Sequence, residues 1–154
     1  MSPMKPQPLN LLTLPFIEAS NYTPAERTKV DLLILHSTES LEKAGTARNV
    51  AAWFAGETAP QASAHYIIDP GEVIRCVPDE CIAWQAPGAN SKGIGIELCG
   101  RAAQSEIEWA DEDSMAILAH AIDLCELLAV FFETHACWLF LHIFDYPARR
   151  ILQQ

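Results

Sequence analysis

The clearest pattern along the chain is a run of apolar residues from Val30 to Leu35 that ends on His36, Ser37 and Thr38. Five of the six residues before His36 are Val, Leu or Ile, which is too continuous for a strand with one wet face and too short for a helix. The run therefore predicts a buried central strand. Ligands of open α/β sheets bind beyond the carboxyl ends of the strands, so we expect the three polar residues at the rim of a site. The alternative is a histidine that merely lies at a strand end.

A helix and a hairpin are predicted next. Apolar spacing favours a helix over residues 46–54, capped by Thr46 and ended by Gly56. We expect the packed face of this helix to consist of Val50, Trp53 and Phe54, because the last two are spaced three and four positions from Val50. Two β-rich runs then flank Asp69-Pro70-Gly71, a strong hairpin turn signal. These runs are residues 62–69 and 72–77.

The rest of the chain predicts a strand, a long helix and a final strand. Glycines alternate with branched residues over 93–100, and strand glycines usually indicate a close approach of something to the backbone. Residues 111–133 are expected to form a helix with acidic residues at its N-terminus. Its apolar positions are Met115, Leu118, Ile122, Leu124, Cys125, Leu128 and Phe132. With strand-like residues 137–144, the order indicates an α/β fold, a mixed central sheet flanked by helices.

Length and composition indicate a single domain. The 154 residues can bury a real core; we expect residues 1–29 to form an N-terminal arm and entry loop and residues 30–154 to form the domain. The net charge of −10 argues against nonspecific nucleic-acid or anionic-membrane binding. Five scattered cysteines and the lack of a signal-peptide pattern indicate the reducing cytosol. We expect a monomer.

Several polar residues fall at or within the predicted strands. His36 ends the first strand, His65 begins another, Glu97 lies in the glycine-flanked strand and His142 lies in the last strand-like segment. In a mixed sheet they could converge on one face. Two histidines with a carboxylate or thiolate are a usual set for a hydrolytic zinc, which keeps its fourth position for water.

Four motifs in this order resemble the zinc-dependent N-acetylmuramoyl-L-alanine amidases, the family of phage lysozyme-like amidases, muropeptide-recycling amidases and peptidoglycan recognition proteins. They cover about residues 12–100, and the following helix is also in place. The motifs are Leu33-Ile34-Leu35-His36-Ser37-Thr38, Ser63-Ala64-His65-Tyr66-Ile67-Ile68-Asp69-Pro70-Gly71, Ala83-Trp84-Gln85-Ala86 and Ile94-Gly95-Ile96-Glu97-Leu98-Cys99-Gly100. The resemblance implies a peptidoglycan recognition protein or amidase-like fold.

The resemblance also implies roles for single residues. His36 corresponds to a zinc ligand, and Glu97 to the proposed general base or acid. Tyr66 lies next to a position where some members use a catalytic tyrosine, and packing is an equal alternative for it and for His65. Trp84 is expected to line the glycan or peptide groove, and Ser37 and Thr38 to contact the substrate. Gln85 replaces a histidine that is frequent in the family, which removes one polar contact without touching the metal.

The C-terminus departs from the family pattern. His142, followed by Pro147-Ala148-Arg149-Arg150, can be aligned as the second zinc ligand, with Arg150 where a lysine steadies the oxyanion. Leu152 stands where the third ligand, Asp or Cys, is expected. Either the site is completed unusually, for instance by Asp145 or solvent, or this part is truncated or replaced.

The resulting hypothesis is a zinc amidase that cuts the amide between the lactyl group of N-acetylmuramic acid and L-alanine in peptidoglycan or muropeptides. It would act in the cytosol as a recycling enzyme, or at the wall as an endolysin released by a holin. The alternative is a muropeptide-binding module of the same fold whose metal site is incomplete and whose catalysis is impaired. An unrelated α/β domain ranks last.

Overall fold

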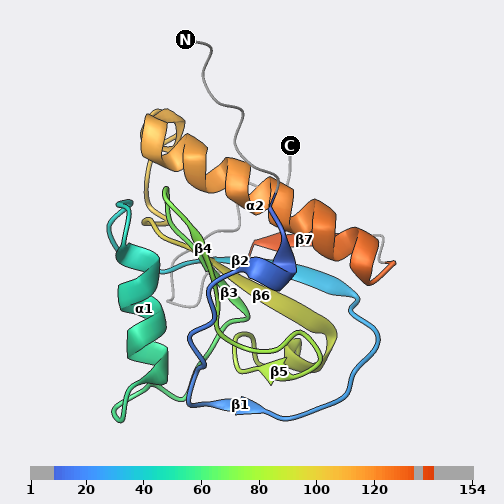
Figure 1. Cartoon of the computed structure of the whole chain (residues 1–154). Helices are drawn as coiled ribbons and strands as arrows, with labels where there is room; N and C mark the ends of the chain where they lie inside the picture. Colours follow the sequence, from blue (N-terminus) through green and yellow to red (C-terminus); the bar gives the residue numbers. More distant parts are fainter. Residues whose placement is uncertain (1–8, 134–136, 141–154) are drawn as a thin grey trace.

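A computed structural model describes residues 9–133 and 137–140 of the chain. A five-stranded mixed sheet, ordered β4-β3-β6-β2-β7, forms its centre, and β1 and β5 form a separate two-stranded sheet (Figure 1). The strands are β1 (Tyr22–Thr23), β2 (Leu32–Ser37), β3 (Tyr66–Ile68), β4 (Val73–Arg75), β5 (Ile82–Ala83), β6 (Gly93–Leu98) and β7 (Cys137–Phe140). The helices are α1 (Thr46–Ala55) and α2 (Glu112–Phe131), with short 3-10 turns η1 (Leu11–Thr13), η2 (Asn90–Lys92) and η3 (Glu108–Ala110).

The predicted buried central strand is confirmed as β2. It lies between β6 and β7 and runs parallel to both, and its residues 33–36 are buried. Strands β3, β6, β2 and β7 are mutually parallel, whereas β4 returns antiparallel to β3 through the predicted hairpin. The predicted mixed sheet flanked by helices is therefore confirmed. β2 is thus an interior strand of the sheet, and His36 near its carboxyl end pairs with Glu97 of β6.

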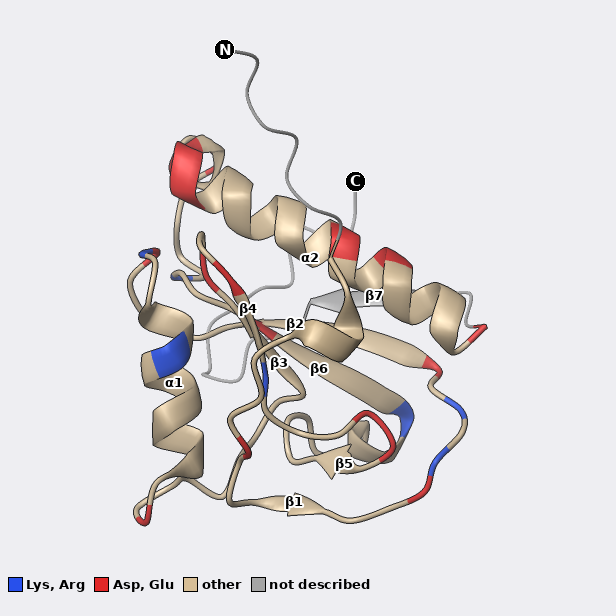
Figure 2. Cartoon of the chain, viewed as in Figure 1, with Lys and Arg blue, Asp and Glu red and all other residues tan. Residues whose placement is uncertain are grey.

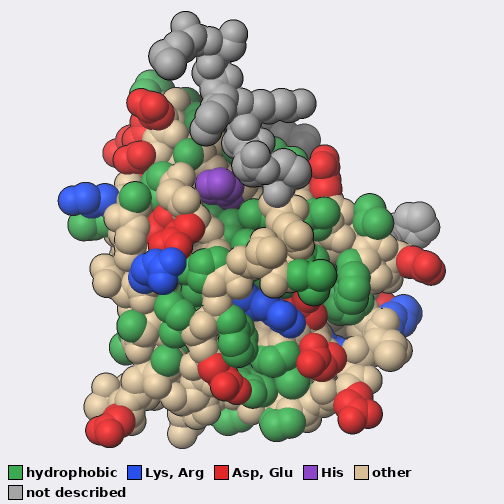
Figure 3. All heavy atoms as spheres, in the orientation of Figure 1, with side chains coloured by type: hydrophobic (Ala, Val, Ile, Leu, Met, Phe, Trp, Pro, Cys, Tyr) green, Lys and Arg blue, Asp and Glu red, His purple; other side chains and the backbone are tan. Residues whose placement is uncertain are grey.

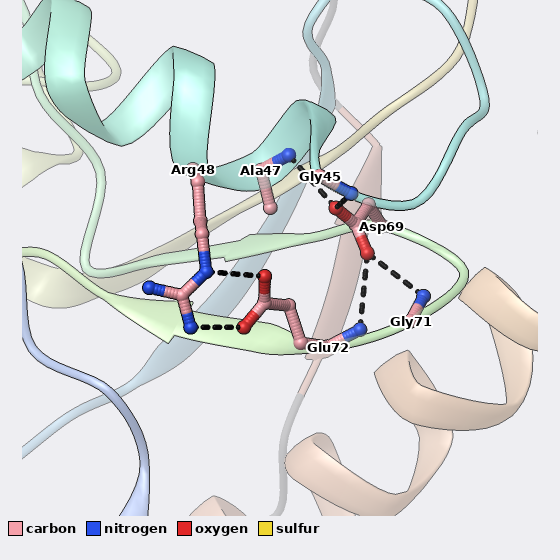
Figure 4. Close-up of polar contacts among 6 residues, drawn as sticks. All are labelled: Gly45, Ala47, Arg48, Asp69, Gly71 and Glu72. Atoms are coloured by element: carbon pink, nitrogen blue, oxygen red, sulfur yellow. Dashed lines mark hydrogen bonds and ion pairs between the residues drawn. The ribbon is translucent and has the colours of Figure 1, made fainter.

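Helix α1 begins differently from the prediction. Thr46 is its first residue, and the N-cap is Gly45, whose φ of 90° is left-handed and whose position has no side chain to cap the helix. Asp69 performs this task from the β3–β4 turn (Figure 4). Its Oδ2 accepts the N–H groups of Gly45 (2.8 Å) and Ala47 (3.0 Å). A carboxylate from a distant element therefore replaces the local cap that was expected.

The same aspartate also closes the hairpin. Its Oδ1 accepts the backbone N–H groups of Gly71 at 2.8 Å and Glu72 at 3.0 Å, and Asp69 is fully buried (Figure 4). Beside it, Arg48 of α1 makes two 2.7 Å hydrogen bonds to the Glu72 carboxylate. Asp69 thus ties α1 to the β3–β4 turn through four charge-assisted hydrogen bonds.

The packed face of α1 agrees with the prediction at Phe54 and, in part, at Val50, which packs against the core, but not at Trp53. Ala47, Ala51 and Phe54 are buried, whereas Trp53, which was expected on this face, is 53% exposed. The helix contacts β3 and β4. Small alanines on the buried side let its backbone approach the sheet closely, and the tryptophan is displaced to the outer side.

Helix α2 confirms the predicted long helix and contacts β3 and β6. The Asp111 side chain caps it by accepting the Ser114 N–H at 2.8 Å, and acidic residues occupy its first turn, seen at its upper left end in Figure 2. It is apolar and long enough to span a membrane by length and composition. Of its apolar stretch 33% is buried, and the buried residues are Ser114, Ile117, Ala121, Leu124, Cys125 and Leu128. Two of the expected apolar positions, Met115 and Ile122, are instead about half exposed.

The segment before β2 lies along the sheet rather than apart from it. Phe16 bridges to Arg75 of β4, and the N–H of Ile17 donates to the Arg75 carbonyl at 2.9 Å. Further on, Tyr22 and Thr23 pair with β5.

Hydrophobic side chains are spread over the face shown in Figure 3, among acidic groups.

Candidate active site

His36 and Glu97 are brought together by strand register. They are partners in the parallel β2–β6 pair, at the carboxyl ends of both strands, and are 1% and 5% exposed. Paired residues of neighbouring strands project from the same face of a sheet. Two residues 61 positions apart in sequence are thus neighbours on one face, as the strand pattern of the sequence predicted.

Burial changes the acidity of Glu97. Removal from water and the nearby carboxylate of Glu39 raise the pKa of Glu97 from 4.5 to about 8. Its Oε2 has no hydrogen-bond partner among the described residues, which is consistent with a neutral carboxylic acid. A carboxyl group in this state can donate a proton at neutral pH and accept it back in a later step.

Gln85 completes the cluster. Its Oε1 lies 2.8 Å from Nε2 of His36, and the side chain is 3% exposed. The family resemblance implied that Gln85 removes a polar contact, whereas its carboxamide makes one with His36, the candidate ligand. No periodic signal could indicate this contact, because Gln85 follows β5 in a loop and reaches β2 from 49 positions away.

Tyr66 lies on the other face of the sheet. It pairs with Ile96, and successive residues of a strand alternate in direction, so Tyr66 projects away from the face of Glu97. It is fully buried, and its hydroxyl donates to Oδ1 of Asp79 at 2.7 Å. Burial and the negative charge of Asp79 raise the pKa of Tyr66. The structure gives Tyr66 the surroundings of a core residue and does not bring it to His36.

His65 is likewise a core residue. It is fully buried, its Nδ1 accepts the N–H of Gly95 at 3.0 Å, and its Nε2 lies 2.9 Å from Nη2 of Arg27. Burial, followed by the positive charge of Arg27, lowers the pKa of His65 to about 3. A histidine with this pKa stays neutral throughout the physiological range, in agreement with the packing alternative.

The three predicted substrate-binding residues each make a side-chain hydrogen bond within the protein. The Trp84 indole is about one-third exposed, and its Nε1 donates to Oγ1 of Thr23 at 2.9 Å. Ser37 donates to Glu39 at 2.7 Å, and the hydroxyl of Thr38 pairs with that of Ser40. Ser37 and Thr38 are half-buried and follow His36 at the rim, so a substrate contact stays a prediction for all three.

The predicted second half of the metal site lies outside the described residues. His142, Asp145 and Arg150 all fall in the segment 141–154, so their roles stay predictions. Within residues 9–133 and 137–140, no group of three His, Cys, Asp or Glu side chains is arranged to hold a metal ion. The described residues therefore contribute one candidate ligand, His36.

Comparison with known proteins decides the family. The sequence profile of N-acetylmuramoyl-L-alanine amidases matches residues 26–136, well over half of the chain. The chain belongs to the N-acetylmuramoyl-L-alanine amidase family. The resemblance stated from the four sequence motifs is thereby confirmed.

A curated relative in this amidase family is N-acetylmuramoyl-L-alanine amidase A of Achromobacter lyticus, 35% identical over 89 residues. The match covers 56% of this chain and 46% of that protein, so the chain aligns with less than half of that relative's length.

Solved structures agree on the amidase fold. The catalytic domain of XlyA superposes with a TM-score of 0.66 at 21% identity, covering 82% of each chain. A selenomethionine derivative of AmpD gives 0.64 at 20% identity, covering 82% of this chain and 80% of that one. A mutant endolysin from Bacillus subtilis gives 0.60 at 20% identity, covering 79% and 77%. At 20–21% sequence identity, the similarity to these structures supports the fold and nothing further.

Proposed function

We propose that this protein hydrolyses the amide bond between the lactyl group of N-acetylmuramic acid and L-alanine in peptidoglycan or muropeptides. Family membership supports the reaction type. The observation that carries the proposal is the pairing of Glu97 with His36 at the carboxyl ends of two parallel strands, where α/β folds place their ligands. A buried carboxyl group at this position can act as the general acid or base in amide hydrolysis.

Glu97 is assigned the proton transfers. With a pKa of about 8 it carries a proton at neutral pH and can deliver it to the amide nitrogen as the carbon–nitrogen bond breaks. Water supplies the hydroxyl group of the new lactyl carboxyl and the proton that Glu97 regains. The products are a free lactyl carboxyl group and a peptide with a free L-alanine amino terminus.

Zinc dependence forms a separate part of the proposal. His36 is a suitable nitrogen ligand, but the described residues alone do not provide the three ligands of a hydrolytic zinc site. We infer that zinc binds at His36 together with the C-terminal segment, where His142 is the predicted second ligand. Bound zinc would supply a Lewis acid and lower the pKa of its water. Arg150 is proposed to stabilise the oxyanion.

The partner and location follow from the same reasoning. We propose a peptidoglycan fragment or muropeptide as the partner, rather than a nucleic acid or a membrane, because the net charge of −10 opposes polyanion binding. A cytosolic monomer is proposed, with access to the wall through a holin if the protein is an endolysin.

The test uses the full chain and a soluble N-acetylmuramoyl-L-alanyl peptide, with mass spectrometry to detect the peptide product. We expect release with added zinc, loss of release with chelator, and little release from Glu97→Gln. Elemental analysis of wild-type and His36→Ala protein reports zinc independently of activity. A protein that binds the muropeptide but releases no product with zinc would overturn the hydrolase assignment in favour of the binding module.

A further inference from the structure

The side chain of Gln85 lies on the backbone of β6 directly beside His36. Its Oε1 approaches Nε2 of His36 to 2.8 Å, and both side chains are almost completely buried. The loop that carries it is anchored on either side of the residue. Oδ1 of Asn90 accepts the N–H groups of Gln85 (3.0 Å) and Ala86 (2.6 Å), and Oγ of Ser63 accepts that of Trp84 (3.0 Å). The backbone that carries the carboxamide is therefore anchored, and the carboxamide itself is held through Oε1, because its Nε2 has no hydrogen-bond partner among the described residues.

Two glycines of β6 make room for this side chain. A Cβ atom added at Gly95 would lie 2.5 Å from Oε1 and 2.6 Å from Cδ of Gln85. One added at Gly93 would lie 3.2 Å from Nε2 of Gln85 and 2.6 Å from Cδ1 of Ile34. Any side chain at Gly95 would have to displace the carboxamide. The close approach that the strand glycines predicted is thus that of Gln85.

The contact determines where the His36 ring carries its proton. A carboxamide oxygen only accepts hydrogen bonds, so with Oε1 of Gln85 facing the ring, Nε2 of His36 is the donor. In a neutral imidazole with the proton on Nε2, the lone pair for a ligand or a proton is on Nδ1. Residues that accept a hydrogen bond from one ring nitrogen in this way orient a functional histidine and select its tautomer.

We propose that Gln85 is a positioning residue that fixes His36 with its proton on Nε2, and that Gly95 is a glycine because Gln85 occupies the space above it. The catalytic consequence rests on the proposed function, whereas the tautomer itself does not. The first, third and fifth residues of the pattern Gly-Ile-Gly-Ile-Glu then lie on the face of β6 that carries the contact with His36. Gly95 forms the floor on which Gln85 lies, Gly93 faces both Ile34 and Gln85, and Glu97 lies at the end of the same row.

The direct measurement is ¹⁵N NMR of the His36 ring in labelled full-length protein, at a pH where the ring is neutral. The wild type should show a protonated Nε2 and an unprotonated Nδ1. In Gln85→Ala the two nitrogen shifts should move toward each other as the proton is shared, and Gln85→Glu, whose carboxylate also accepts, should keep the wild-type pattern. A wild-type proton on Nδ1, or an unchanged spectrum in Gln85→Ala, would refute the proposal.

The glycine floor is tested by a double-mutant cycle. Gly95→Ala should shift the His36 ring signals as Gln85→Ala does, and adding Gly95→Ala to Gln85→Ala should cause no further shift because the displaced group is already gone. Gly56→Ala is the matched control, because its added Cβ would come no closer than 3.4 Å to a neighbouring atom. Ring signals that stay in place in Gly95→Ala, or shift equally in Gly56→Ala, would contradict the role of the floor.

Hydrolysis of the muramoyl peptide is measured separately. If the proposed function holds, Gln85→Ala should lower kcat/KM by about 10- to 100-fold, the usual effect of removing such a partner. If no product forms with any variant or with the wild type, the proposed function fails while the tautomer result stands on its own. An active Gln85→Ala enzyme with a shifted tautomer and unchanged kcat/KM would overturn the catalytic part of the inference.

Discussion

Replacing Glu97 with glutamine should stabilise the folded protein at alkaline pH and have little effect at acidic pH. The substitution keeps the shape of the side chain and removes its ability to ionise. Glu97 is 5% exposed, and its Oε2 has no partner among the described residues, so water and protein contacts do little to support the charged form. The variant isolates the cost of a buried negative charge.

The sign follows from the direction of the shift. The pKa of Glu97 is raised in the folded protein, so its contribution to stability is complete below about pH 4.5 and is lost as the pH rises through about 8. A rise from 4.5 to about 8 corresponds to about 5 kcal/mol, at about 1.4 kcal/mol per unit. The advantage of Glu97→Gln over the wild type should therefore grow from near zero at pH 4 toward several kcal/mol at pH 9.

Urea unfolding of both proteins from pH 4 to pH 9, with chelator present, measures this difference. Glu106→Gln, a substitution of an exposed carboxylate, supplies the background. If the Glu97→Gln and wild-type free energies of unfolding run parallel over this range, Glu97 is not a buried acid with a raised pKa. The assignment of Glu97 as a proton donor at neutral pH would then also be wrong.

Other substitutions test the remaining structural assignments. Asp69→Ala removes the acceptor of four backbone N–H groups and should lower the free energy of unfolding by about 3 kcal/mol or more in urea titrations; a loss under 1 kcal/mol would contradict its bridging role. Tyr66→Phe should cost about 1–2 kcal/mol of stability yet leave kcat/KM for muramoyl peptide nearly unchanged, whereas a large loss of activity would restore its catalytic assignment. Leu128→Ala should cost about 2–5 kcal/mol and Ile122→Ala under about 1 kcal/mol by thermal unfolding; equal costs would mean that α2 packs on a different side.

The strands of the central sheet and their order along the chain were predictable because their signals are local, whereas β1 and β5, of two residues each, were not predicted. A continuous apolar run indicated β2, and the Asp-Pro-Gly turn indicated the β3–β4 hairpin. The pairing of His36 with Glu97 also follows from sequence, since both lie near the ends of strands that a parallel sheet aligns. Periodicity and strand ends carry this information without knowledge of the tertiary contacts.

The errors arose where distant residues override local preference. Thr46 is a good N-cap by type, but Asp69 accepts the N–H groups of Gly45 and Ala47 from the β3–β4 turn. The N-cap position therefore falls on Gly45, and Thr46 becomes the first residue of the helix. Helix α2 is apolar on most sides, so its pattern could not separate buried Leu128 from exposed Ile122. Gln85 could not be placed at all, because a loop residue has no period that indicates its direction.

Strand β6 shows why the fold and the site have to be interpreted together. Its odd- and even-numbered positions face opposite sides of the sheet, so Ile94, Ile96 and Leu98 enter the hydrophobic core while Gly93, Gly95 and Glu97 share the face of His36. A shift of register by one residue would put Glu97 in the core and leave the isoleucines where Gln85 now packs. The core residues thus fix the register, and the register alone brings the carboxyl group to the histidine. For this reason Gly95→Ala should disturb the site through Gln85 while the isoleucines hold β6 in place.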